Sequence, residues 1–187
     1  PKSPRNLTVP DAVDLAGAVG RRARTVAVVV DPDDDLVDRI VANVRPDVLQ
    51  LHGAETPERV GAIKTRAGLT VFKAVPVSDA WEVAAAERYS AVADRILFDT
   101  KAPPGSELPG GNGLSFDWAI LEAAAAPFAL SGGLDADNVA EAIRQSGAAL
   151  VDVSSGVETA PGEKDSVLIN QFVHAVREAA PKQKKAS

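Results

Sequence analysis

Residues 95–101 read Arg-Ile-Leu-Phe-Asp-Thr-Lys, a short apolar run that ends in a carboxylate, Asp99. The proline- and glycine-rich segment 102–113 follows this run. An apolar run without in/out alternation is typical of a buried strand in a parallel sheet. Because α/β folds bind ligands at the carboxyl ends of such strands, we expect Asp99 to face the chemistry. The alternative is that Asp99 only caps a turn with Thr100.

Similar runs recur at regular intervals and alternate with helical patterns. The predicted strands are residues 24–30, 47–51, 70–75, 94–98, 127–131 and 149–153. The predicted helices are residues 34–44, 56–67, 79–89, 115–126, 135–146 and 165–180. Regular alternation of strand and helix indicates consecutive βαβ units, so we predict an α/β protein with a parallel sheet.

The glycines distinguish an open sheet from a barrel. An open doubly wound sheet usually carries Gly-x-Gly-x-x-Gly after its first strand, and this chain has none there. Instead, the motifs Ser131-Gly132-Gly133-Leu134 and Ser154-Ser155-Gly156-Val157 follow the last two predicted strands. In (β/α)8 TIM barrels the loops after strands 7 and 8 bind phosphate. We therefore predict a TIM barrel with strands 3–8 present in these residues, and we expect strands 1–2 in a preceding unit of about 30 residues.

The composition restricts the kinds of protein. The chain has 187 residues, of which 45% are hydrophobic and 25% are charged, which suits one globular domain. We predict a single barrel domain over residues 1–180 and a solvated tail over residues 181–187. A net charge of −6 argues against a nucleic-acid partner. No apolar run approaches the ~20 residues of a membrane span and no signal peptide is visible, so we expect a cytoplasmic protein.

The two glycine motifs predict a phosphate site. Adjacent glycines let the backbone approach an anion, and a helix start near Asp135 would offer unpaired N–H groups. The two serines would add hydroxyl donors. The candidate phosphate-binding residues are Gly132, Gly133, Ser154, Ser155 and Gly156. The alternative is that these are ordinary loop residues.

Four other polar side chains are candidates for the same end of the sheet. Alternation along their strands places His52 and Asp152 near strand ends on the inward face. Lys73 is also inward, and as the alternative to a binding role it could pair with Asp99 or Asp152. Arg5 could hold a carboxylate in bidentate fashion. The alternatives are a satisfied internal hydrogen-bond network for the buried groups and plain solvation for Arg5.

Seven motifs run in order across nearly the whole chain. They are Pro1-Lys2-Ser3-Pro4-Arg5, Leu49-Gln50-Leu51-His52-Gly53-x-Glu55, Leu97-Phe98-Asp99-Thr100-Lys101, Ser115-Phe116-Asp117-Trp118, Leu130-Ser131-Gly132-Gly133-Leu134, Val151-Asp152-Val153-Ser154-Ser155-Gly156-Val157-Glu158 and Pro161-Gly162-x-Lys164-Asp165. The set resembles phosphoribosylanthranilate isomerase of tryptophan biosynthesis.

This resemblance implies a (β/α)8 barrel that converts N-(5-phosphoribosyl)anthranilate to 1-(2-carboxyphenylamino)-1-deoxyribulose 5-phosphate, an Amadori rearrangement. It implies Asp99 as general acid, Arg5 as the ligand of the anthranilate carboxylate, the five loop residues around the phosphate, and His52 and Asp152 in the pocket. It implies no cofactor, no metal and no partner beyond the small-molecule substrate, in a monomer or homodimer. The family's general base is a cysteine near the end of strand 1, and the 187 residues contain no cysteine.

Two alternatives to the isomerase stay open. The first is another phosphate-binding barrel enzyme such as indole-3-glycerol-phosphate synthase, for which Lys73 and Lys101 would be the acid and base. The second is a non-catalytic phosphosugar-binding barrel remnant, which would fit the missing base. We expect the base to lie in a preceding segment rather than the chain to be a rearranged, inactive variant.

Overall fold

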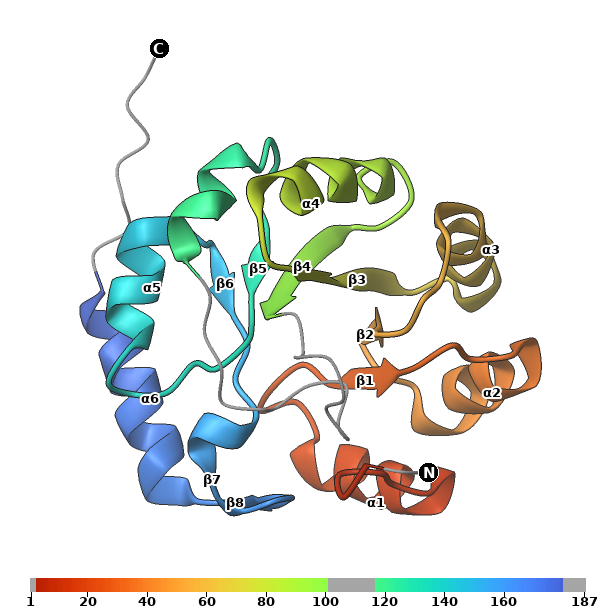
Figure 1. Ribbon diagram of the computed structural model, residues 1–187. Helices are drawn as coiled ribbons and strands as arrows, with labels where there is room; N and C mark the ends of the chain where they lie inside the picture. Colours follow the sequence, from red (N-terminus) through yellow and green to blue (C-terminus); the bar gives the residue numbers. More distant parts are fainter. Residues whose placement is uncertain (1–2, 101–116, 180–187) are drawn as a thin grey trace. The chain divides into compact units, whose positions relative to one another are not determined.

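The computed structural model describes residues 3–100 and 117–179. Six strands alternate with helices along the chain, as predicted (Figure 1). The strands are β1 (Val26–Val29), β2 (Val48–Leu51), β3 (Thr70–Val77), β4 (Arg95–Thr100), β5 (Ala129–Leu130) and β6 (Leu150–Val151). They are neighbours in a sheet in the order in which they occur in the chain, which confirms an α/β protein. That they are strands 3–8 of a TIM barrel stays a prediction.

The helices follow the predicted pattern, with several changes of helix type. The α-helices are α1 (Val9–Val19), α2 (Asp34–Arg39), α3 (Pro57–Ala67), α4 (Ala80–Ala85), α5 (Val139–Ser146) and α6 (Ser166–Glu178). A π-helix, η1 (Ile40–Val44), continues α2, and the 3-10 helices are η2 (Ala86–Tyr89), η3 (Trp118–Ala123) and η4 (Ser155–Val157).

The chain forms two compact units. Among the described residues, the β1–β3 unit consists of residues 6–75 and 88–96, and the β4–β6 unit consists of residues 3–5, 76–87, 97–100 and 117–179. The single domain predicted over residues 1–180 stays a prediction, and the predicted tail lies outside the described residues.

In the β1–β3 unit, β1 pairs in parallel with β2, and β2 pairs in parallel with β3. Local chemistry explains why α3 lies between β2 and β3. Thr56 is its N-cap and accepts the Arg59 N–H, Pro57 occupies the first turn, and Gly68 ends the helix in a left-handed conformation. The helix buries its apolar positions Val60 and Ile63 completely.

In the β4–β6 unit, β4 pairs in parallel with β5, and β5 with β6. All residues of β4 from Ile96 to Asp99 are buried, as its continuous apolar run predicts. The helices α5 and α6 pack against each other beside β5 and β6 (Figure 1). Phe98 meets the ring of Phe128 edge to face, with centroids 5.3 Å apart.

Three features differ from the sequence predictions. The first is α1, which begins with a capping box between Thr8 and Asp11 and buries no residue. The second is an antiparallel hairpin of β7 (Glu158–Ala160) and β8 (Glu163–Lys164). The third is η3, a 3-10 helix where an α-helix was expected. In the described residues no helix is both long and apolar enough to cross a membrane.

Candidate active site

Three polar residues follow β4, β5 and β6 in one row. The strands pair with Phe98 opposite Leu130, so the next residue of each strand, Asp99, Ser131 and Asp152, falls in the following row. The ladder continues into this row, because the Ser131 N–H donates to the Phe98 carbonyl at 2.8 Å and the Asp152 N–H donates to the Leu130 carbonyl at 2.8 Å. Ser131 Oγ also donates to Asp152 Oδ2 at 3.2 Å. The row presents two carboxylates at the carboxyl end of the sheet.

Asp99 is the buried member of this row, with 6% of its surface exposed. Its Oδ1 accepts the N–H of Thr100 at 2.8 Å, so it does make the local turn contact that sequence alone offered as an alternative. A carboxylate can accept about four hydrogen bonds, so this one bond does not exclude contacts with a ligand. The local contact fixes the orientation of the side chain and is compatible with a chemical role.

The two glycine loops that follow β5 and β6 touch through their backbones. A Cβ on Gly156 would collide with the carbonyl of Leu134 and lie 3.0 Å from Asp135 Cα. Gly132 has a φ of 94°, and a Cβ there would lie 2.5 Å from the Thr100 nitrogen. A side chain would clash with the backbone at both positions, and the positive φ at Gly132 also favours glycine. The two loops therefore lie side by side, and their role as a phosphate site stays a prediction.

The glycine pair after β5 has backbone donors for an anion. Within residues 3–100 and 117–179, no backbone hydrogen bond outside the helices and strands uses the N–H groups of Gly132 and Gly133. By contrast, the predicted helix start near Asp135 is used internally. The Asp135 carboxylate accepts the N–H groups two and three residues on at 2.9 and 3.0 Å, and α5 begins only at residue 139. Donors for an anion would come from the loops and not from that helix.

Arg5 binds a carboxylate in bidentate fashion, as predicted, but the carboxylate belongs to Glu158. The Arg5 Nε donates to Oε1 at 2.8 Å and Nη2 to Oε2 at 2.5 Å. Lys164 Nζ donates to the same Oε1 at 2.6 Å and to the Ser154 carbonyl at 2.8 Å. We call Arg5, Glu158 and Lys164 the Glu158 cluster. The pKa of Glu158 is lowered to about 2, first by the hydrogen bond from Arg5 and also by the contact with Lys164, which together outweigh the opposing effect of burial.

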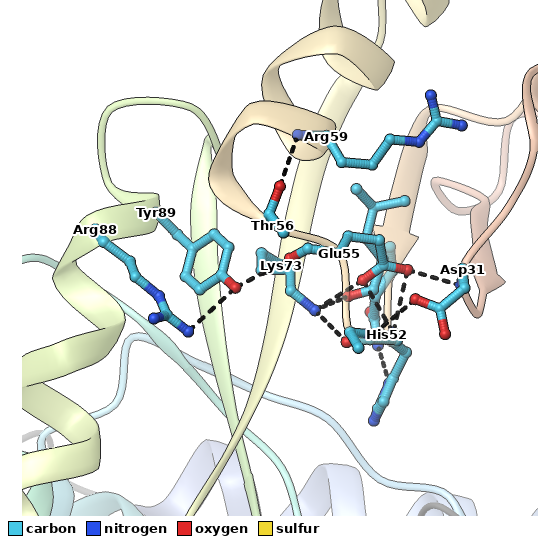
Figure 2. A network of polar contacts seen from close by, with 12 residues as sticks. Asp31, His52, Glu55, Thr56, Arg59, Lys73, Arg88 and Tyr89 are labelled. Atoms are coloured by element: carbon cyan, nitrogen blue, oxygen red, sulfur yellow. Dashed lines mark hydrogen bonds and ion pairs between the residues drawn. The ribbon is translucent and has the colours of Figure 1, made fainter.

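His52 lies at the end of β2 in the β1–β3 unit, where its ring Nδ1 is 3.3 Å from Gln50 Nε2 (Figure 2). The two side chains thus share a face, as strand alternation predicts. Lys73 pairs with neither of the carboxylates, Asp99 and Asp152, that the alternative interpretation offered it. Its Nζ donates to Glu55 Oε2 at 2.8 Å and to the Gly53 carbonyl at 2.7 Å (Figure 2).

We call Glu55, Lys73, Gly53 and Tyr89 the Glu55 cluster. Burial raises the pKa of Glu55, but the hydrogen bond and charge of Lys73 and the N–H groups around it outweigh burial, so the net pKa is lowered. The Gly53 N–H donates to Glu55 Oε2 at 3.0 Å, and the Tyr89 hydroxyl donates to the Glu55 carbonyl at 3.0 Å. The cluster ties the loop after β2 to β3 and η2.

Asp99, Asp152, Arg5 and the five loop residues thus all lie in the β4–β6 unit, whereas His52 lies in the β1–β3 unit. Sequence reasoning missed Glu158, Lys164 and Ser131 as members of this region. The signal for the first two was the Pro-Gly pair at residues 161–162, which is typical of a turn and places β8 against β7. In the described part of the chain, no group of three His, Cys, Asp or Glu side chains could hold a metal ion.

Comparison with known proteins agrees with this geometry. The family model described as N-(5'phosphoribosyl)anthranilate (PRA) isomerase matches residues 1–175. The chain belongs to this family. It is 55% identical over 181 residues to the N-(5'-phosphoribosyl)anthranilate isomerase of Brucella canis, an alignment that covers 96% of this chain and 82% of that relative.

Solved structures of phosphoribosylanthranilate isomerases resemble the chain closely. The enzyme from Thermotoga maritima matches with a TM-score of 0.83 and 32% identity, over 95% of this chain and 84% of that one. The Thermus thermophilus enzyme matches with a TM-score of 0.80 and 27% identity, over 95% and 84%. A third isomerase structure holds reduced 1-(o-carboxyphenylamino)-1-deoxyribulose 5-phosphate, with a TM-score of 0.79, 31% identity and coverage of 95% and 83%.

Proposed function

We propose that Asp99 is the general acid with which this chain acts as an N-(5'-phosphoribosyl)anthranilate isomerase. Membership of the family makes the chain an isomerase of tryptophan biosynthesis. The observation that carries the role of Asp99 is its place at the end of β4, in one row with Ser131 and Asp152 and beside Gly132. A carboxyl group at this end of the sheet lies where α/β barrels bind and act on their ligands.

The reaction then divides into three proton movements. Asp99 gives a proton to the ribose ring oxygen, the C1–O bond breaks, and the nitrogen lone pair forms C1=N. Loss of the C2 proton to a base gives an enolamine, which tautomerises to the amino ketose. The base expected from the family resemblance is a cysteine that is not among these 187 residues, so the residues here account for acid and binding roles.

The phosphate is proposed to bind at the two glycine loops. The backbone N–H groups of Gly132, Gly133, Ser155 and Gly156 are its donors, and Ser154 contributes from the same loop. The contact between these loops supports the assignment, because it gathers several donors around one point without a helix N-terminus.

The carboxylate of the anthranilate is proposed to bind Arg5. The guanidinium lies in the same unit as Asp99 and the phosphate loops, and it already makes a bidentate pair with a carboxylate. Asp152 would line the pocket, held by Ser131. The prediction that His52 contacts the substrate stays a prediction.

The finer description of the fold and setting is also proposed. We infer a (β/α)8 barrel, because the solved isomerases match the chain over most of its length. We infer a cytoplasmic protein that binds its small-molecule substrate without nucleic acid. One neighbour is described as monomers made from a dimeric isomerase of Thermotoga maritima, which supports either a monomer or a homodimer here.

The test measures kcat and ligand affinity of Asp99→Asn in the full polypeptide as its host produces it. Asp152→Asn, in the same row of residues at the strand ends, is the matched control. We expect Asp99→Asn to lower kcat about 10²–10⁴-fold, the usual range for a general acid, with affinity for the reduced product analogue nearly unchanged. The control should affect affinity more than kcat. Equal losses of affinity and kcat in Asp99→Asn would contradict the acid role.

A further inference from the structure

The carboxylate of Glu158 joins two of the proposed binding elements. It accepts two hydrogen bonds from Arg5, which lies 153 residues away in the chain, and one from Lys164 at 2.6 Å. The Glu158 side chain is 4% exposed, so the two cations cover it almost completely. Lys164 in turn contacts Ser154 in the phosphate loop. A single buried carboxylate therefore connects the proposed carboxylate-binding residue to the proposed phosphate loop.

The way in which Arg5 is held leaves one edge of its guanidinium for another ligand. Glu158 takes the side formed by Nε and Nη2. A guanidinium has five N–H donors, so two N–H groups on Nη1 and one on Nη2 remain. Two of these three, one on Nη1 and one on Nη2, form the end-on edge, which can bind a second carboxylate in bidentate fashion. Among the described residues, no hydrogen bond or ion pair engages Nη1 of Arg5.

Lys164 has the opposite character, because all three of its donors are used. Its Nζ donates to Glu158 Oε1 at 2.6 Å, to the Ser154 carbonyl at 2.8 Å and to Ser154 Oγ at 3.3 Å. It therefore has no N–H left for a substrate oxygen. Its role is to hold the loop residue Ser154 and to place a positive charge beside the phosphate loop.

The β7–β8 hairpin brings Glu158 and Lys164 together, because they lie close in the sequence on its two strands. Glu158 of β7 stands opposite Lys164 of β8 in the antiparallel register. Gly162 in the turn has a φ of 90°, as the third position of a type II turn requires after Pro161. The residues from Ser154 to Lys164 thus form one continuous segment of phosphate loop, 3-10 turn and hairpin.

We propose that Glu158 and Lys164 are positioning residues: Glu158 orients Arg5 so that its end-on edge faces the substrate carboxylate, and Lys164 fixes the phosphate loop at Ser154. This inference rests on the proposed function and adds two residues to it. The cluster holds two cations and one anion, so one net positive charge remains to attract the substrate's anionic groups.

The test compares Glu158→Gln and Lys164→Met with Glu163→Gln, an exposed neighbour on β8, in the full polypeptide. Glutamine cannot accept both N–H groups of Arg5 as a carboxylate does. We expect Glu158→Gln to raise KM at least tenfold with kcat within threefold of wild type. Its affinity for anthranilate should fall at least tenfold, and its affinity for inorganic phosphate less than threefold.

Lys164→Met should show the opposite selectivity, with phosphate affinity down about tenfold and anthranilate affinity within threefold of wild type. Lys164→Arg should restore phosphate binding, and Glu163→Gln should behave as wild type. A purely structural role predicts equal loss of both affinities and of kcat, and that result would overturn the proposal. Should Glu158→Gln not fold, unchanged phosphate affinity in Lys164→Met overturns the proposal by itself.

Wild-type behaviour separates this inference from the proposed function. Wild type that neither turns over the substrate nor binds the reduced product analogue would refute the isomerase assignment itself. Wild type that does both, with a Glu158→Gln variant that matches it in KM, would refute only the positioning role.

Discussion

Two buried carboxylates stand at the centre of two different charged clusters. In the Glu55 cluster both charged side chains are hidden, with Lys73 3% and Glu55 1% exposed. In the Glu158 cluster only the carboxylate is hidden, because Arg5 is 23% and Lys164 is 42% exposed. The first cluster uses every donor of its cation inside the protein, whereas the second leaves part of a guanidinium unused.

The difference shows that a buried carboxylate paired with cations can stabilise a loop in one unit and leave a cation available for a ligand in the other. Burying both partners of an ion pair costs desolvation on both sides, which the Glu55 cluster offsets with backbone hydrogen bonds to Lys73 and Glu55. Such a cluster can fix a loop but cannot bind a further ligand. Arg5 keeps some contact with solvent, so a substrate anion can replace water there at a smaller cost.

The largest expected effect comes from opening the Glu55 cluster. Lys73→Met leaves Glu55 buried without its cation, and removal of one partner of a buried pair typically costs about 3–5 kcal/mol of unfolding free energy. Urea unfolding at pH 7 measures the loss. The matched change in the other cluster, Lys164→Met, should cost less than half as much, because Glu158 keeps Arg5 and Lys164 is partly solvated.

A double variant checks the cause of that loss. Lys73→Met combined with Glu55→Gln removes the unpaired charge and keeps an oxygen that can accept the Gly53 N–H. It should recover more than half of the stability lost in Lys73→Met. A double variant as unstable as the single one would mean that packing, and not the unpaired charge, causes the loss.

The Glu158 cluster should show itself in the pH dependence of stability. The folded pKa of about 2 lies below the usual value of 4.5, so the unfolded chain binds more protons between these values. The contribution is fully present above pH 4.5 and is lost as the pH falls towards 2. We expect a loss of about 2–3 kcal/mol, since the cations are partly solvated.

Urea unfolding at pH 6, 4 and 3 measures this loss, and Glu158→Gln should flatten that part of the profile. The Glu55 carboxyl, whose pKa is also lowered, contributes with the same sign. Because Glu55 is present in both wild type and Glu158→Gln, its contribution cancels when the two profiles are compared. A Glu158→Gln profile as steep as that of wild type would count against the tight pairing with Arg5.

The smallest effect is expected from a third cluster, between α2 and α3 on the surface. Arg66 pairs with Asp38 at 2.7 Å and with Asp34 at 3.0 Å, and all three side chains are well exposed. Exposed pairs are screened by water and salt. Arg66→Gln should destabilise the protein less than any change in the two buried clusters, and 1 M salt should abolish the difference in thermal unfolding. A difference that survives 1 M salt would contradict this ranking.

Local patterns explain which parts of the fold were predictable. The β4 run and the Thr56–Pro57 helix start were readable because their signals lie within a few residues of the element they define. The helix α1 was not predicted, although its Thr8–Asp11 capping box and the proline in its first turn are local signals of a helix start. The expected helix over residues 115–126 is a 3-10 helix from Trp118 to Ala123, and its predicted first residues lie outside the described ones.

The candidate site was predictable where a single strand end or loop carries the chemistry. Asp99, the two glycine loops and Arg5 were proposed from residue type and position, and their roles stay predictions. Glu158 was missed because nothing near it in the sequence marks it as the partner of a residue at the other end of the chain.

The sequence by itself determined the order of strands and helices, the strand-end position of Asp99 and the glycines whose backbone no other residue can adopt. These follow from hydrophobic period and φ, which are properties of a few neighbouring residues. Only the tertiary structure decided which charges meet. Lys73 pairs with Glu55 and Arg5 with Glu158, because a buried charge pairs with whichever opposite charge the fold brings within hydrogen-bonding distance, however far away it is in the chain.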